Sequence, residues 1–80
     1  MEKLKTKSSA PRLPFDCVVG TEFEDIENPF SGEKVNCPPD FVAVYDTIKG
    51  AEIMGKYEYM EKGLAWARQY YPDLYMRLLD

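Results

Sequence analysis

The sequence predicts a small, mainly α domain of the α+β class, in which an irregular or β-hairpin N-terminal half packs on an antiparallel helical hairpin and a short C-terminal helix. Two patterns lead to this prediction. From residue 36 onward, apolar residues recur three and four positions apart, and Gly55 and Pro72 divide them into three helices. Before residue 36 no helical period is present, and turn-forming residues separate short apolar runs.

Composition divides the chain into an arm and a body. Residues 1–14 hold lysine, serine and two prolines with little apolar content, so we expect a flexible basic arm there. Four basic residues against one acidic residue give +3 over residues 1–13, which leaves −7 for the remainder of a chain whose net charge is −4. A single small domain is expected over residues 15–80, with a strand and turn region at 15–35 and a helical region at 36–80.

The strand and turn region predicts one short strand and one hairpin. Apolar residues alternate over residues 15–19, which suits a strand. Further on, Asn28-Pro29 starts a turn because proline presets φ at the first central position, and Gly32 can supply the positive φ that closes it. Ile26 and Val35 are then expected to face one another in a small hairpin or Ω-like loop lying over the helices.

The first helix is expected to begin near residue 36. Asn36 or Cys37 can act as the N-cap, and Pro38-Pro39 fit the first turn, where missing N–H groups cost nothing. Asp40 adds a carboxylate at the positive end of the helix dipole. The apolar stripe of this helix consists of Phe41, Val44, Tyr45, Ile48 and Ala51. Such a stripe predicts the face that packs in the core.

Two glycines mark the second half of this helix. Gly50 weakens a helix by roughly 1 kcal/mol relative to alanine, so we expect it to allow close approach of another backbone. Gly55 is expected to end the helix as a left-handed C-cap.

A second helix is expected over residues 57–71, and a third begins at Pro72. The second helix has two apolar rows, of which Tyr57, Met60, Leu64, Ala67 and Tyr71 form the first and Tyr59, Gly63, Trp66 and Tyr70 form the second. The apolar face of the third helix holds Leu74, Tyr75, Leu78 and Leu79. One row can pack against the first helix, so the other needs cover from the third helix, the N-terminal half or another molecule.

Part of the second half resembles a tetratricopeptide repeat. The residues that match its later part are Gly55-x-Tyr57, Met60, Leu64, Ala67 and Pro72, about a quarter of the chain. The resemblance implies two antiparallel helices joined by a Gly-x-Tyr turn. The earlier part departs from the repeat, since Val44, Thr47, Ile48 and Ala51 stand where it has a large aromatic, leucine, glycine and tyrosine. The chain contains one copy of this pattern, whereas a solenoid needs about three repeats. The resemblance therefore implies the geometry of the helix pair and not peptide binding.

A second resemblance covers residues 28–80. The order Asn-Pro-x-Ser-Gly, a proline-capped helix with Tyr45-Asp46 and Gly50-Ala51-Glu52, and a helix containing Trp66 before Tyr75-Met-x-Leu-Leu-Asp80 is similar to short uncharacterised proteins of tailed phages. That family has no assigned activity, so the resemblance implies origin and not mechanism.

Composition disfavours several functions. The chain has no histidine and two cysteines, Cys17 and Cys37, so a zinc site within one chain is excluded and the commonest general base is missing. We therefore expect no enzyme activity, catalytic residue, metal or cofactor. No apolar run suits a transmembrane helix, and the absence of an apolar signal segment after Met1 predicts a cytoplasmic protein, in the host cytoplasm if phage-encoded. A Cys17–Cys37 disulfide stays open, although a reducing compartment disfavours it.

The aromatic residues favour a protein-interaction function. All six tyrosines and Trp66 fall between residues 45 and 75, more than we expect so small a core to hide, and Tyr and Trp are enriched at protein interfaces. We expect a non-enzymatic interaction module, an adaptor or modulator of a host protein if phage-encoded, that binds an unknown protein partner or forms a homo-oligomer. The expected contact surface is Tyr59, Trp66, Tyr70 and Tyr75. The other interpretation of these residues is core packing with incidental exposure.

The alternative function is association with nucleic acid through the basic arm. The candidate phosphate contacts are Lys3, Lys5, Lys7 and Arg12. The net charge of −4 disfavours it, because nucleic-acid-binding domains usually present a basic face. Binding of this kind would weaken steeply with salt and disappear when residues 1–13 are removed. A solvated tail that aids solubility is the third interpretation of the arm.

Overall fold

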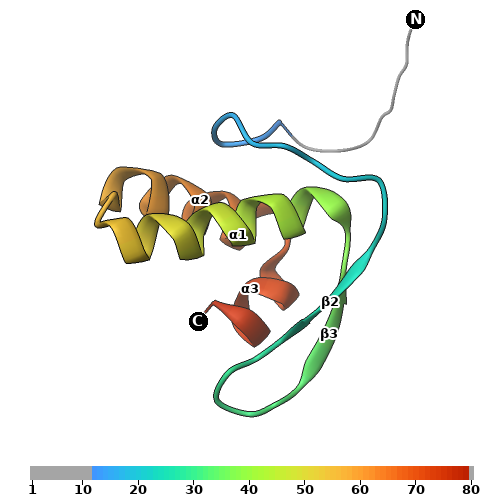
Figure 1. Cartoon of the computed structure of the whole chain (residues 1–80). Coiled ribbons are helices and arrows are strands. Elements are labelled where there is room, and N and C mark those ends of the chain that lie inside the picture. Colours follow the sequence, from blue (N-terminus) through green and yellow to red (C-terminus); the bar gives the residue numbers. More distant parts are fainter. Residues whose placement is uncertain (1–11, 80) are drawn as a thin grey trace, which may run out of the picture.

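The computed structural model describes residues 12–79, which form three helices and one β-hairpin (Figure 1). The strands are β2 (Glu24–Glu27) and β3 (Lys34–Cys37), and the helices are α1 (Pro39–Met54), α2 (Tyr57–Tyr70) and α3 (Pro72–Leu78). α2 returns beside α1, and α3 packs against both α2 and the hairpin. The prediction of a small, mainly helical α+β domain is confirmed.

The hairpin has the predicted register and turn. β2 and β3 are antiparallel, and Ile26 lies opposite Val35. In the turn, Oδ1 of Asn28 accepts a hydrogen bond from the backbone N–H of Phe30 at 2.8 Å. Gly32 has φ of 77°, the left-handed conformation that glycine adopts without steric cost. The side chain of Asn28 and the backbone freedom of Gly32 therefore set the turn.

Two local predictions are wrong. Residues 15–19 form no strand, because this segment lies against α2 instead of pairing with another strand. The first helix begins at Pro39 with Pro38 as its N-cap, whereas Asn36 and Cys37 belong to β3. β3 extends to the proline pair because Cys37 still pairs with β2, and a residue before proline favours extended backbone.

α1 forms the centre of the core. Its buried residues are Asp40, Phe41, Val42, Ala43, Val44, Tyr45, Ile48 and Ala51, so the predicted stripe is confirmed. The first two turns are buried more widely than the stripe predicts, since residues 40–45 are all buried. The hairpin and α2 both pack on α1, which explains why this helix has more than one buried face.

The turn between α1 and α2 follows the predicted C-cap chemistry. Gly55 has φ of 75° and ψ of 21°, a left-handed conformation. The backbone N–H of Lys56 donates to the carbonyl of Ala51 at 2.8 Å, which is the six-to-one bond of a Schellman motif. This tight turn brings α2 back antiparallel to α1 (Figure 1).

Of the two helical glycines, Gly63 lies in close contact with the neighbouring helix and Gly50 does not. A Cβ atom at Gly63 would lie 2.5 Å from Cγ1 of Ile48 and 3.3 Å from the ring of Phe15. A Cβ atom at Gly50 would meet nothing within 4 Å, because this residue faces a surface depression. The prediction for Gly50 is therefore wrong, and the close approach belongs to the second helix.

The two apolar rows of α2 do not divide into one buried row and one exposed row. Ala67 and Trp66 are buried although they belong to different rows. Tyr57, from the row expected to pack on α1, is exposed. It is the first residue of α2, directly after the tight turn, and its side chain is 64% exposed.

One buried carboxylate joins the start of α1 to the junction of α2 and α3. The hydroxyl of Tyr71 donates to the carboxylate of Asp40, with distances of 3.0 Å to Oδ1 and 2.9 Å to Oδ2. Oδ1 also accepts the backbone N–H of Phe41 at 2.8 Å. Burial and the hydrogen bond to Asp40 raise the pKa of Tyr71 to about 12. Asp40 thus has hydrogen-bond donors in place of the water it has lost.

α3 is held against the hairpin turn by polar contacts. The side-chain amide of Asn28 donates to the carbonyl of Arg77, and the guanidinium of Arg77 lies 3.8 Å from the carboxylate of Glu33. Leu78 of α3 is buried, in agreement with the predicted apolar face. These contacts join the hairpin turn to the C-terminal helix.

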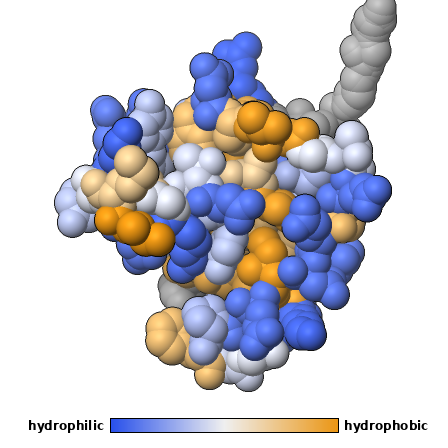
Figure 2. All heavy atoms as spheres, viewed as in Figure 1, coloured by the Kyte–Doolittle hydropathy of each residue, from blue (hydrophilic) through white to orange (hydrophobic). Residues whose placement is uncertain are grey.

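Hydrophobic side chains gather in the middle of the molecule, between the helices and the hairpin, as Figure 2 shows. A smaller hydrophobic group lies at the end where α1 turns into α2, and Ile53 and Met54 are exposed there. Within residues 12–79, none of the helices is long and apolar enough to cross a membrane.

The contact at Gly63 predicts that adding a side chain destabilises the protein at Gly63 but not at Gly50. Gly63→Val should lower the free energy of unfolding by about 1–3 kcal/mol, because its added atoms overlap Ile48. The matched change Gly50→Val places the same atoms in open space and should alter stability by less than about 0.5 kcal/mol. Urea unfolding of both variants measures the difference, and equal losses would contradict the close contact.

The Asp40–Tyr71 contact predicts a stability loss for Tyr71→Phe. Removing the hydroxyl deprives a buried carboxylate of a donor, which should cost about 1.5–3 kcal/mol at neutral pH. Tyr57→Phe is the matched control, since the side chain of Tyr57 is exposed. Urea unfolding at pH 7 compares the two variants with the native chain.

The same contact predicts an alkaline loss of stability. Below pH 10, Tyr71 is protonated in both the folded and unfolded chain, so its contribution is complete. As the pH rises from 10 to about 12, the unfolded chain releases the proton and the folded chain retains it, so the contribution is lost. The native protein should lose stability more steeply over this range than Tyr71→Phe does, and parallel curves would contradict the raised pKa.

Candidate interaction surface

Residues 12–16 lie along α2 and run antiparallel to it (Figure 1). At one end, Nε1 of Trp66 donates a hydrogen bond to the carbonyl of Arg12 at 2.7 Å. At the other end, the ring of Phe15 packs edge-on against Tyr59 with ring centroids 5.7 Å apart, and it covers Gly63. We call α2 and the segment 12–16 together the α2 face.

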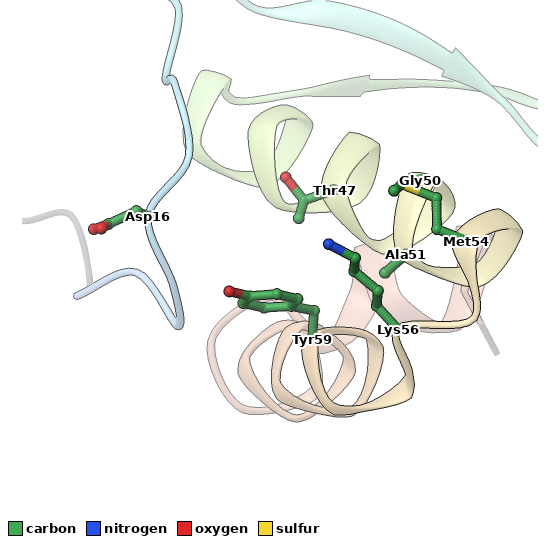
Figure 3. A pocket seen from close by; sticks show the side chains of 7 residues that line it. All are labelled: Asp16, Thr47, Gly50, Ala51, Met54, Lys56 and Tyr59. Carbon is green, nitrogen blue, oxygen red and sulfur yellow. The ribbon is translucent and has the colours of Figure 1, made fainter.

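One depression of the α2 face lies between α1 and α2. It has a volume of about 290 Å³ and is lined by Asp16, Thr47, Gly50, Ala51, Met54, Lys56 and Tyr59 (Figure 3). The side chain of Lys56, in the turn before α2, and that of Tyr59, on α2, extend into this space, whereas the carboxylate of Asp16 points away from it. Gly50 contributes open space because it has no side chain. The depression therefore combines an apolar floor with one ammonium group and one phenol.

A second depression lies further along α2, beside residues 12–14. It has a volume of about 370 Å³ and is lined by Arg12, Leu13, Pro14, Lys62, Ala65, Trp66, Gln69 and Tyr70. Two of these residues are basic and none is acidic. The rings of Trp66 and Tyr70 pack together here with centroids 6.0 Å apart. This depression is therefore apolar and aromatic, with positive charge at Arg12 and Lys62.

The four predicted contact residues have different environments. Tyr59 and Tyr70 are each 45% exposed, and both lie on the α2 face. Trp66 is only 4% exposed, so it belongs to the core and offers a contact surface only at its edge in the second depression. Tyr75 lies on α3, where the guanidinium of Arg68 sits 5.5 Å from its ring centroid. The structure thus places Trp66 and Tyr70 in contact beside one depression, Tyr59 beside the other depression, and Tyr75 on a different helix.

Of the four candidate phosphate contacts, Arg12 is the one that the structure places. Lys3, Lys5 and Lys7 lie outside the described residues. Arg12 is exposed, and its backbone is fixed by Trp66. Leu13 packs against the core, so residues 12–14 belong to the folded domain and not to the arm assigned from composition.

Several residues of the α2 face were missed by the sequence reasoning. Lys56, Lys62 and Gln69 line the two depressions together with the predicted tyrosines. A signal was present, since Lys56, Tyr59, Lys62, Trp66 and Gln69 recur at spacings of three and four and therefore share one side of a helix. The position of the segment 12–16 beside α2 has no such signal in the sequence, because it involves a hydrogen bond between residues 54 positions apart.

The two cysteines are free thiols in the structure, which therefore has no Cys17–Cys37 disulfide. Cys37 is fully buried, and its Sγ lies 3.3 Å from the carbonyl of Val35. Burial, with a smaller effect of the Asp25 carboxylate, raises the pKa of Cys37 to about 11. Burial and then Asp16 raise the pKa of Cys17 as well. Neither thiol has the character of an activated nucleophile.

Among residues 12–79, no cluster of three or more Cys, Asp or Glu side chains is arranged to hold a metal ion.

Comparison with protein-family models, curated proteins and solved structures gives no match to the chain. The resemblance to short tailed-phage proteins over residues 28–80 stays a prediction.

Thiol reactivity tests the environments of the two cysteines. In the Cys17→Ser variant, Cys37 should react with Ellman's reagent at pH 8 only after unfolding in urea, because the thiol is buried and little thiolate forms below its pKa of about 11. Reaction of the folded variant at the rate of the unfolded chain would contradict this burial. The native protein, in which Cys17 is partly exposed, serves as the comparison.

Proposed function

We propose that the protein is a non-enzymatic interaction module that binds a protein partner through the α2 face. The observation that supports this proposal best is the position of Tyr59 and Tyr70. Both rings are nearly half exposed, and each lies at the rim of a depression on the same helix. Half-exposed aromatic rings beside hollows suit recognition of a protein surface, because they add a large contact area at a small cost in side-chain entropy.

Packing around the α2 face supports the same function. Tyr59 is held by Phe15, and Tyr70 is held by Trp66, so neither ring is free to take many orientations. An ordered aromatic surface loses little further freedom when a partner binds. The main chain at Arg12 is also fixed, through its hydrogen bond to Trp66. The α2 face is therefore preorganised for binding.

Exposed hydrophobic residues outside the α2 face support this function less directly. Phe30 is at the tip of the hairpin turn, and Ile53 and Met54 are at the end of α1. Others lie before the hairpin or on α3, namely Val18, Val19, Phe23 and Met76. Of all these residues, Met54 alone lines one of the two depressions.

The phage origin, a role as adaptor or modulator of a host protein, self-association and a cytoplasmic location are parts of the same proposal. Self-association through the α2 face would cover Tyr59 and Tyr70 without a second kind of protein. Sedimentation of the native protein and of the tyrosine variants described next distinguishes a homo-oligomer from a monomer that binds another protein.

Capture of partners from nuclease-treated host lysate tests the proposed function. The paired change Tyr59→Ser and Tyr70→Ser should reduce recovery of the main protein partner by about tenfold or more, because the loss of aromatic hot-spot contacts worth about 1.4 kcal/mol in total changes a binding constant tenfold. Tyr57→Ser is the matched control, since Tyr57 is exposed on α2 but lines neither depression. Quantitative mass spectrometry of the eluted proteins gives the ratio.

The controls separate binding from folding. Circular dichroism should show the native helix content in each variant, and thermal unfolding should show only the partial loss of stability expected for half-exposed rings, so that the variants stay folded at the temperature of the capture. A partner retained equally by all variants would contradict the α2 face as the contact surface. Recovery that disappears completely on nuclease treatment would favour the alternative, nucleic-acid association through Lys3, Lys5, Lys7 and Arg12.

A further inference from the structure

We infer that the segment recognised by the α2 face is an acidic peptide with an apolar side chain that enters the depression beside Tyr70. This inference rests on the proposed function and adds the chemistry of the partner. It follows from two features of the described residues, namely the distribution of charge around the two depressions and the apolar lining between the charges.

The lining of the two depressions is more basic than the chain as a whole, while Glu58 and Glu61 of α2 lie outside that lining. The whole chain has 14 acidic and ten basic residues, yet the residues that line the two depressions include three basic side chains and one acidic side chain. The basic residues are Arg12, Lys56 and Lys62, and the acidic residue, Asp16, points away from the first depression (Figure 3). An acidic segment is therefore attracted to this face and repelled by most of the remaining surface.

The three basic residues are exposed and lie within reach of a partner. Ion pairs within the described chain involve Lys49 with Glu52 and Arg77 with Glu33, and none of these residues lines a depression. Arg12 and Lys62 border the same hollow, so a carboxylate placed over it can meet both cations. Arginine adds directional recognition, because its planar guanidinium binds a carboxylate through two parallel hydrogen bonds.

The lining of the second depression explains why the partner needs an apolar residue as well as acidic residues. Leu13, Pro14, Ala65 and the rings of Trp66 and Tyr70 surround its floor. Its volume of about 370 Å³ suits an apolar or aromatic side chain. Burial of that side chain would supply affinity, while Arg12 and Lys62 would fix the register of the flanking carboxylates.

Selection of a random displayed peptide library with the full-length protein tests the inference. The enriched peptides should share an apolar or aromatic residue flanked by Asp or Glu. Synthetic peptides of that consensus should change the fluorescence of Trp66, the single tryptophan of the chain, which lines the second depression. Their affinity should fall with increasing salt, since exposed charge pairs are screened.

Charge reversal gives the quantitative test. Arg12→Glu and Lys62→Glu should each weaken binding of the consensus peptide by about tenfold. Lys34→Glu, the same change on the exposed strand β3, should weaken it by less than about twofold because screening limits distant charges. Arg12→Glu keeps the backbone carbonyl that accepts the Trp66 hydrogen bond, and Lys62 is exposed, so both variants should fold.

The outcomes separate this inference from the proposed function. An acidic–apolar consensus whose binding depends on Arg12 and Lys62 supports both. A neutral or basic consensus, or one bound equally by the charge-reversal variants, overturns the acidic partner but leaves the interaction module in place. Tighter binding of oligo(dT) than of any peptide, lost in Arg12→Glu, overturns the inference in favour of nucleic acid. If no peptide is enriched and no protein is captured through Tyr59 and Tyr70, both proposals fail.

Discussion

The absence of a side chain at residue 63 is the constraint on which the fold and the α2 face both depend. Ile48 of α1 and the ring of Phe15 occupy the space that a Cβ atom at Gly63 would need. α1, α2 and the N-terminal segment therefore meet at one point. Because Phe15 also contacts Tyr59, the position of that exposed ring follows from the same contact. A change at residue 63 would disturb the helix pair and the proposed binding surface together.

A domain of this size has few residues with which to build a core, and α1 supplies most of them. Its buried N-terminal half includes Asp40, a residue that is costly to bury without hydrogen-bond partners. The Tyr71 hydroxyl meets that need and at the same time ties the α2–α3 junction to α1. Burial of α1 thus leaves α2 as the helix whose outer side is available for binding. Within α2, Ala67 is buried in the core, whereas Tyr59 and Tyr70 are exposed on the surface.

Local chemistry in the sequence predicted much of the fold but only part of the candidate site. The pairing of Ile26 with Val35 and the C-cap at Gly55 follow from short-range turn rules, and the structure confirms both. The choice between Gly50 and Gly63 as the point of close approach depends on how two helices meet, which spacing within one helix cannot show. The sequence predicted Trp66 as a surface residue for a similar reason. Its indole N–H donates to the carbonyl of Arg12, 54 residues away in the chain, and spacing within α2 cannot show such a contact.

The most direct test of this account is nuclear Overhauser spectroscopy of the free full-length protein. The contact at residue 63 predicts cross-peaks that connect the α protons of Gly63, the δ methyl of Ile48 and the ring protons of Phe15. Cross-peaks between the Phe15 and Tyr59 rings should accompany them. Helical chemical shifts for α1 and α2 without any cross-peak from Phe15 to Gly63 or Tyr59 would contradict the account, because the α2 face would then lack the segment that shapes it.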